Sequence, residues 1–200
     1  LTALTNRMKE LGFRGTVYLV QGGGLVQSVE ESVRRAVSLI GSGPAAAPSG
    51  AIRLGQCFSS SDIFSVDMGG TSFDVCLIRD GVIPTTDFNW VEDERVAMKM
   101  VDVQSVGAGG GSIAWIDALG LLRVGPKSAG ADPGPVCYGK GGTQPTVTDA
   151  DLILGYIPAD YFLGGEILLR SDLAETAIRT VAEPLRLDVP AAAHTIFTTV

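Results

Sequence analysis

The stretch IFSVDMGGTSFDV, residues 63–75, decides how the rest of the sequence is interpreted. An apolar run ends in an acid, Asp67, crosses a turn with two glycines and continues as a strand in which apolar and polar residues alternate. Glycines at such a turn let backbone N–H groups converge on an anion, and the hydroxyls that follow can add donors. The pattern predicts a β-hairpin that binds phosphate through Gly69, Gly70, Thr71 and Ser72.

Asp67 is the candidate metal ligand of this hairpin. Mg²⁺ in proteins usually keeps several waters and takes only one or two carboxylates beside phosphate oxygens, so one acid at the end of a strand can serve. The alternative is an ordinary glycine-rich hairpin in which Asp67 and Asp74 accept hydrogen bonds from nearby amides. Spacing alone leaves both interpretations open.

The composition is that of a globular, acidic protein. The chain has 200 residues, of which 46% are hydrophobic and 18% charged, with 15 Lys and Arg against 22 Asp and Glu. A chain of this length buries roughly 70% of the surface that it exposes when unfolded, so its core needs no disulfides or metal ions. Arg34 and Arg35 form the only adjacent cationic pair, so the sequence has no basic stripe for a nucleic-acid duplex. We expect no nucleic-acid partner.

Cysteine usage and hydropathy indicate a cytoplasmic protein without a membrane anchor. The longest uncharged run, residues 36–52, is interrupted by glycines and prolines and does not predict a membrane-spanning helix. Cys57, Cys76 and Cys137 are odd in number and lack a CxxC pair, which favours reduced thiols. Because the chain opens on Leu1 and ends in an apolar run, we expect a fragment of a longer protein.

Three helices are predicted before the hairpin, the first of them from the helical spacing of apolar residues in the segment 1–11. Ser28, with Glu31 three residues later, indicates the N-terminus of a helix that reaches about Ile40. A segment rich in small residues, 45–54, predicts a third helix that packs closely against its neighbours.

A second hairpin and a long loop follow the first hairpin. Residues 112–117 and 121–124 flank a short turn and predict paired strands. Residues 125–145 form a loop rich in Gly and Pro, and loops of that length are usually functional or disordered. Nothing in the sequence marks an internal domain boundary.

Two acids lie at the start of the next predicted helix. Thr148, with Asp151 three residues later, predicts the N-cap, which already explains Asp151. Asp149 remains as a catalytic or metal-binding candidate, although a carboxylate is also stabilised by the dipole at a helix start.

A glycine-rich segment, residues 107–112, is the remaining candidate for nucleotide binding. It is not a dinucleotide motif, because Ser112 stands where GxGxxG requires its third glycine, and no lysine follows as in a P-loop. Its small residues would let a nucleotide approach the backbone at Gly109, Gly110 and Gly111, but a close-packed structural turn explains them equally well.

These motifs together resemble the hydantoinase A / 5-oxoprolinase family. The match extends over nearly the whole chain and keeps one order, which argues against coincidence; its segments are residues 42–46, 67–74, 106–114, 122–135 and 145–150. One departure is Phe73, which stands where the family often has Thr and removes a possible hydroxyl donor. The chain is then the central part of a hydantoinase A-type domain.

The resemblance implies a fold and a set of cofactors. The fold is α/β of the actin-like ATPase (ribonuclease H-like) type, present in part, with the hairpin as its phosphate-binding loop. The cofactors are ATP and Mg²⁺. Gly69, Gly70 and Thr71 would surround phosphate, and Asp67 would hold the metal and take part in catalysis.

The resemblance also implies an activity. It is that of a subunit that uses ATP to phosphorylate a cyclic amide, such as hydantoin or 5-oxoproline, so that the ring opens. Two alternatives stay open: a subunit of an ATP-dependent carboxylase that acts on a ketone such as acetone or acetophenone, and a non-catalytic nucleotide-binding or subunit-docking module. A hydantoinase B-type partner subunit is expected.

Overall fold

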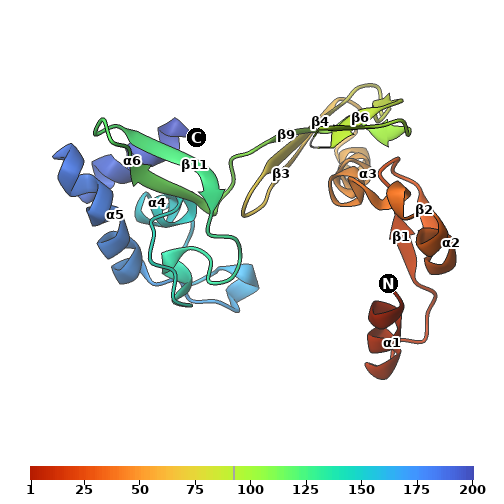
Figure 1. Ribbon diagram of the computed structural model, residues 1–200, viewed down its shortest axis with the longest axis horizontal. Coiled ribbons are helices and arrows are strands. Elements are labelled where there is room, and N and C mark those ends of the chain that lie inside the picture. The colour runs from red at the N-terminus through yellow and green to blue at the C-terminus, as the bar shows by residue number, and fades with distance from the viewer. Residues whose placement is uncertain (92) are drawn as a thin grey trace. The chain divides into compact units, whose positions relative to one another are not determined.

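The computed structural model describes residues 1–91 and 93–200 (Figure 1). They divide into two compact units: unit 1 comprises Leu1–Asp67 and Asp74–Gln104, and unit 2 comprises Met68–Phe73 and Ser105–Val200. Both contain helices and strands, so the chain has the mixed α/β structure that its sequence predicts. The division passes through the glycine hairpin: its turn belongs to unit 2, and most of its two strands belong to unit 1. The units are therefore not continuous segments of the chain, and the sequence pattern does not predict them.

Unit 1 consists of short strands and helices. Its helices are α1 (Thr2–Glu10), α2 (Val29–Arg34) and α3 (Ser42–Cys57), with the 3-10 helix η1 (Ala36–Leu39). The strands that begin or end in it are β1 (Tyr18–Val20), β2 (Val26–Ser28), β3 (Ile63–Met68), β4 (Phe73–Ile78), β5 (Thr85–Thr86), β6 (Asn89–Val91), β7 (Glu94–Val96), β8 (Met100–Val101) and β9 (Gln104–Val106). Three of them form a sheet in the order β3-β4-β9, and the pairs β1–β2, β5–β8 and β6–β7 are antiparallel.

The helix predicted over residues 45–54 is confirmed as α3. Its small residues allow close packing, since a Cβ atom on Gly55 would overlap the side chain of Ile63. Ala45 of this helix is buried in one cluster with Cys76 and Ile78 of β4. The small-residue segment therefore forms the face on which the strands of unit 1 pack.

The helix predicted from Ser28 to Ile40 is only partly right. Ser28 caps α2 as expected, because its Oγ accepts a hydrogen bond from the Glu31 N–H at 3.2 Å. The α-helix nevertheless ends at Arg34 and a 3-10 helix follows. The Ser38 hydroxyl donates to the Arg35 carbonyl at 2.7 Å, and such side-chain bonds compete with the α-helical pattern.

The predicted glycine hairpin is confirmed. β3 and β4 are neighbours in their sheet, and the Gly69 N–H donates to the Ser72 carbonyl at 2.9 Å, which closes a short turn between them. The turn is exposed from Gly69 to Thr71. A strand, an exposed glycine turn and a second strand are therefore arranged as the sequence predicts.

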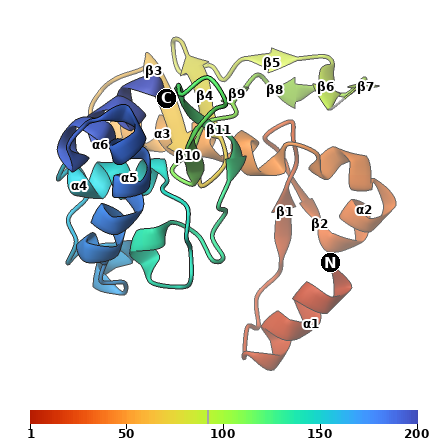
Figure 2. The same ribbon diagram turned by 60° about the vertical axis from the view of Figure 1, so that its left-hand side comes forward.

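Unit 2 packs helices on a second hairpin. Its elements are β10 (Ser112–Ile116), β11 (Leu122–Ser128), α4 (Val147–Ile153), α5 (Ser171–Leu185) and α6 (Val189–Thr199), with the 3-10 helices η2 (Val136–Tyr138) and η3 (Leu163–Gly165). β10 and β11 are antiparallel, as predicted, and α4, α5 and α6 lie against one another and against this hairpin (Figure 2). Ala150, Ala182 and Ala193 are buried where these helices meet, because a small side chain lets helix backbones approach closely.

Within residues 1–91 and 93–200, none of the helices combines the length and the apolar composition that a membrane span requires.

Candidate functional site

The turn between β3 and β4 presents backbone N–H groups that the fold does not use. The amides of Gly70, Thr71 and Ser72 have no acceptor among the described residues, whereas the Gly69 amide is bonded within the turn. Successive unpaired amides on a glycine turn form an anion-binding concavity. Three of the four residues predicted to bind phosphate, Gly70, Thr71 and Ser72, therefore keep an N–H group that a phosphate oxygen could accept from, and Gly69 does not.

The glycine segment after β9 supports this turn by direct backbone contact. The Gly110 N–H donates to the Gly69 carbonyl at 2.9 Å, and the Gly111 N–H donates to the Gly70 carbonyl at 2.7 Å. A Cβ atom on Gly109 would lie 2.7 Å from the Gly69 oxygen, so only glycine fits there without a shift. Because the amides of Gly110 and Gly111 donate to the turn, they are not available to a nucleotide. The segment instead forms a platform that holds the turn in place.

Ser128 adds a side-chain bond to the same arrangement. Its Oγ donates to the Gly70 carbonyl at 2.8 Å and accepts hydrogen bonds from the Thr71 hydroxyl at 3.3 Å and from the Gly130 amide at 3.0 Å. Ser128 is the last residue of β11, which runs further into the predicted loop than the sequence indicates. Ser128 lies 57 residues after Thr71 and 58 residues after Gly70, so contacts between distant parts of the chain fix the turn.

A cavity of about 280 Å³ lies beside the turn, within unit 2. Backbone of the turn and of the glycine segment forms part of its wall, and aromatic side chains and one acid form another part; the residues concerned are Gly69, Gly70, Gly110, Gly111, Tyr138, Phe162 and Asp151. Such a cavity, with few polar groups on a mostly apolar wall, is typical of a small-molecule site.

Asp149 is part of the framework of unit 2. Its side chain is fully buried and its oxygens accept four hydrogen bonds, from the amides of Val136, Cys137 and Thr146 at 2.7–3.2 Å and from the Thr146 hydroxyl at 2.8 Å. Thr146 and Asp149 form the capping box of α4. The structure therefore gives Asp149 the task of joining the loop before α4 to the helix.

The N-cap predicted at Thr148 is wrong by two residues. Thr146 with Asp149 and Thr148 with Asp151 have the same spacing, so the sequence does not choose between them. The structure selects the first pair, and Thr148 instead donates its hydroxyl to the Gly110 carbonyl at 2.8 Å. Asp151 is therefore not part of the cap of α4.

Asp151 is the acid that the sequence analysis missed. It lines the cavity beside the turn, and its Oδ1 is buried without a hydrogen-bond partner among the described residues. Burial raises the pKa of this carboxyl above its ordinary value, because a charged form is disfavoured away from water. The sequence contains a signal that could have found it. Two TxxD frames overlap there, 146–149 and 148–151, and because a helix has one N-cap, either Asp149 or Asp151 had to be free of capping.

Asp67 is the last residue of the first segment of unit 1, directly before the turn in sequence, and is exposed. No group of three or more His, Cys, Asp and Glu side chains suited to a metal ion occurs in the described part of the chain. A cage made of protein ligands alone is therefore not formed by these residues. A single exposed carboxylate such as that of Asp67 fits Mg²⁺, which takes most of its ligands from waters and phosphate oxygens.

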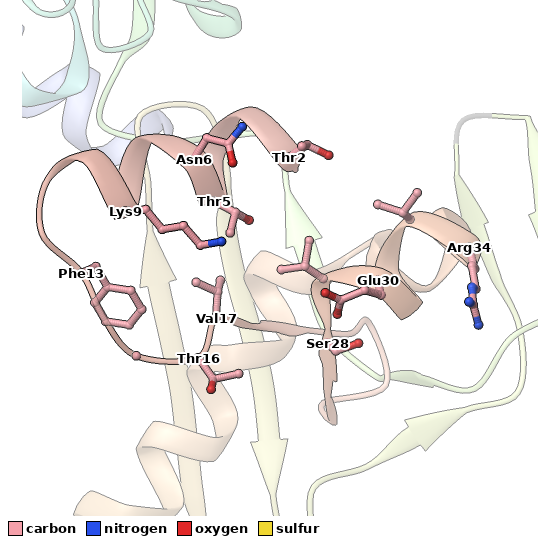
Figure 3. A pocket seen from close by; sticks show the side chains of 13 residues that line it. Thr2, Thr5, Asn6, Lys9, Phe13, Thr16, Val17, Ser28, Glu30 and Arg34 are labelled. Atoms are coloured by element: carbon pink, nitrogen blue, oxygen red, sulfur yellow. The ribbon is translucent and has the colours of Figure 1, made fainter.

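One hollow of unit 1, between α1 and α2, contains none of the predicted site residues. It is open, has a volume of about 640 Å³, and is lined by α1, the segment after it and α2 (Figure 3). Lys9, Glu30 and Arg34 bring charges of both signs to it, and α1 has no buried residue. Because this hollow contains none of the predicted site residues, whereas Gly69, Gly70, Gly110 and Gly111 line the cavity beside the turn, we place the candidate site in unit 2.

The chain belongs to the hydantoinase/oxoprolinase family, which residues 1–200 match. It is 48% identical over 197 residues to the caprolactamase subunit alpha of Pseudomonas jessenii. The matched region is 96% of this chain and 28% of that protein. The crystal structure of the ATP-dependent caprolactamase of that organism matches with a TM-score of 0.77 and 44% identity, over 100% of this chain and 29% of the other. The nucleotide-free structure of acetone carboxylase matches with a TM-score of 0.82 and 32% identity, over 98% of this chain and 28% of the other.

These relatives establish the family and the fold of the chain. The chain spans less than a third of the length of each of them. Its mixed α/β fold is the one found in acetone carboxylase and caprolactamase. Its relatives are ATP-dependent enzymes, one a caprolactamase and one a carboxylase.

Proposed function

We propose that this chain is the nucleotide-binding part of an ATP-dependent enzyme subunit that opens cyclic amides by phosphorylating the amide oxygen. The proposal includes ATP and Mg²⁺ as cofactors and an actin-like ATPase fold for the complete domain. A hydantoinase B-type subunit is the proposed partner. A cytoplasmic location is consistent with the free thiols of Cys57, Cys76 and Cys137.

The observation that carries the proposal is the turn with three unpaired amides next to Asp67. Catalysis of phosphoryl transfer consists almost entirely of positioning and of offsetting charge. Gly70, Thr71 and Ser72 would position phosphate oxygens with their N–H groups, and Asp67 would hold Mg²⁺ through water. The platform of Gly109, Gly110 and Gly111 would keep these donors in place during the reaction.

The proposed reaction begins with phosphorylation of the amide and continues with hydrolysis of the activated ring. The amide oxygen takes the terminal phosphoryl group, and ADP leaves. Water then adds to the ring carbon, the carbon–nitrogen bond breaks as the nitrogen takes the proton of the added hydroxyl, and an acyl phosphate remains. A second water cleaves the acyl phosphate, and phosphate is released. The amide carbon becomes a carboxylate and the ring nitrogen an amine, so one ATP and two waters are consumed per ring opened.

The likeness to acetone carboxylase favours a second candidate, an ATP-dependent ketone carboxylase subunit. The higher identity to caprolactamase, 48% over 197 residues, supports ring opening as the first candidate. A non-catalytic nucleotide-binding module is the third outcome that an experiment has to separate.

Phosphorus NMR of the complete protein with its co-purifying subunits separates the three. The protein is incubated with MgATP and either caprolactam, hydantoin or 5-oxoproline, or with acetone and bicarbonate. ADP that forms only with a cyclic amide supports the proposal, and nucleotide consumption that requires ketone and bicarbonate together supports the carboxylase. The variant Asp67→Asn should lose the activity, whereas Asp87→Asn, a change of another exposed acid of unit 1, should keep it.

A further inference from the structure

Asp151 carries a functional group that the fold of unit 2 does not use. Its Oδ1 is buried and unpaired among the described residues, whereas Asp149, two residues earlier, accepts four hydrogen bonds. An unpaired buried polar atom is destabilising and calls for an explanation, such as a ligand, an ordered water or a catalytic role. The carboxyl group of Asp151 therefore has a buried acceptor that is available to a ligand.

Two cavities of unit 2 share Asp151. One is the cavity beside the glycine turn, and the other, of about 310 Å³, has a mainly apolar wall that includes Phe73, Val106 and Val147. Met68 also lines both. A ligand that extends from one cavity to the other would contact apolar side chains at one end, the backbone of the turn at the other end, and a single carboxyl group between them.

We propose that Asp151 accepts a hydrogen bond from the ring N–H of a cyclic amide whose methylene groups lie in the apolar cavity and whose carbonyl oxygen faces the glycine turn. This inference rests on the proposed function and adds to it a substrate-binding residue and a substrate pocket. In a small ring amide the C=O and N–H bonds point to the same side of the ring. One polar edge of the substrate can therefore face both the turn and Asp151 while the carbon skeleton stays in apolar surroundings.

The same bond gains strength as the reaction proceeds. When the amide oxygen takes the phosphoryl group, the nitrogen electron pair is drawn toward the ring carbon and the N–H becomes more acidic. The proton then passes to Asp151, whose carboxylate becomes a carboxylic acid, and the nitrogen retains its electron pair. An interaction that strengthens toward the transition state increases the rate of the chemical step. The raised pKa of Asp151 makes its carboxylate a better proton acceptor.

Phe73 fits this assignment. A hydroxyl-bearing residue at this position would add a polar group to the cavity, whereas the aromatic ring extends its apolar wall. The pocket then selects a substrate with a hydrocarbon ring and one amide edge.

The test compares caprolactam with N-methylcaprolactam, which lacks the N–H, in the complete protein with its subunits. Asp151→Leu has the same number of non-hydrogen side-chain atoms but no acceptor, and Asp151→Asn keeps an acceptor oxygen but cannot take the proton. Asp160→Leu, at an exposed acid of the same unit, is the matched control. Two quantities are measured for each variant: kcat/KM for lactam-dependent ATP consumption, and lactam binding by ligand-observed NMR.

We expect the wild type to prefer caprolactam and Asp151→Leu to lose at least tenfold in kcat/KM and in binding for caprolactam alone, with the KM for ATP unchanged. Asp151→Asn should keep the KM for caprolactam within a few fold and lower kcat, and Asp160→Leu should behave as the wild type. Asp151→Leu should also melt at a higher temperature, because it removes an unpaired buried polar atom; a purely structural Asp151 would give the opposite change.

The binding measurement keeps the two proposals apart. If no cyclic amide stimulates ATP consumption in the wild type, the proposed function fails, and the NMR comparison still decides the role of Asp151. If Asp151→Leu binds caprolactam and discriminates against the N-methyl compound as the wild type does, the assignment is overturned. A wild type that binds neither lactam, or an Asp151→Leu change that affects acetone but not caprolactam, overturns it as well.

Discussion

Gly109→Ala tests whether the glycine platform holds the turn between β3 and β4 in place. The new Cβ would lie 2.7 Å from the Gly69 oxygen and the Thr71 nitrogen and 2.8 Å from the Gly70 carbon, all of them backbone atoms. Ordinary contacts between heavy atoms are about 3.5–4.0 Å, so the turn has to move outward by most of an ångström. Overpacking of this kind costs about 1–3 kcal/mol. The hydrogen bonds that now join the platform to the turn would stretch beyond their useful range.

Gly107→Ala is the matched control, because a Cβ at Gly107 has no neighbour within 4 Å. At a position with this freedom, alanine stabilises a protein by about 0.4–1 kcal/mol through the unfolded chain. Thermal unfolding of the complete protein should therefore place Gly109→Ala below the wild type and Gly107→Ala at or above it. ATP consumption should fall about tenfold to a hundredfold in Gly109→Ala alone, since displacing catalytic groups by about 1 Å has effects of this size. If both variants are as stable and as active as the wild type, the platform does not have this role.

Four further results follow from the site. Asp67→Asn should lower ATP turnover at least about tenfold, equivalent to roughly 1.4 kcal/mol of barrier, in a steady-state assay. Asp149→Asn should lower the melting temperature, because its amide N–H₂ would face buried donors at a cost of about 1–3 kcal/mol. With a thiol reagent at pH 8, Cys57 should react and Cys137 should not, since burial and the nearby Asp149 raise the pKa of the Cys137 thiol. The gain in melting temperature of Asp151→Leu should grow as pH rises above about 3.9: the raised pKa of Asp151 means that the folded state holds its proton more tightly, so ionisation at higher pH destabilises the wild type and not the variant.

Each of these results has an outcome that contradicts it. Undiminished turnover in Asp67→Asn would remove that residue from the metal site. An Asp149→Asn variant with wild-type stability and no activity would restore Asp149 as a catalytic candidate. Labelling of the Cys137 thiol at the rate of the Cys57 thiol would mean that η2 opens readily. For Asp151→Leu, a gain in melting temperature that does not change between acid and neutral pH would show that the ionised carboxylate is not destabilising. Tyr138 is the other titratable group in the cavity, and its raised pKa keeps it neutral over this range.

The pattern of local residues was sufficient for the elements that depend on neighbours in sequence. Apolar runs on either side of Gly69 and Gly70 predict the first hairpin, and the strands about residues 118–120 predict the second, because strand alternation and turn glycines are local properties. Ser28 was recognised as a cap for the same reason. The helix that it starts ended early because Ser38 bonds the Arg35 carbonyl, a side-chain choice that a periodic pattern does not contain.

The sequence by itself determined the glycine turn between two strands, with Asp67 before it and hydroxyls after it, and the small-residue helix that precedes it. Only the tertiary structure decided what surrounds that turn. It placed Gly109, Gly110 and Gly111 against the turn backbone, and it chose Thr146 over Thr148 as the cap of α4, which made Asp149 structural in its contacts and left Asp151 unpaired in a cavity. Both TxxD frames satisfy the same local rule, so the choice depends on which acid can reach the amides of Val136 and Cys137, and those amides approach α4 only in the folded chain.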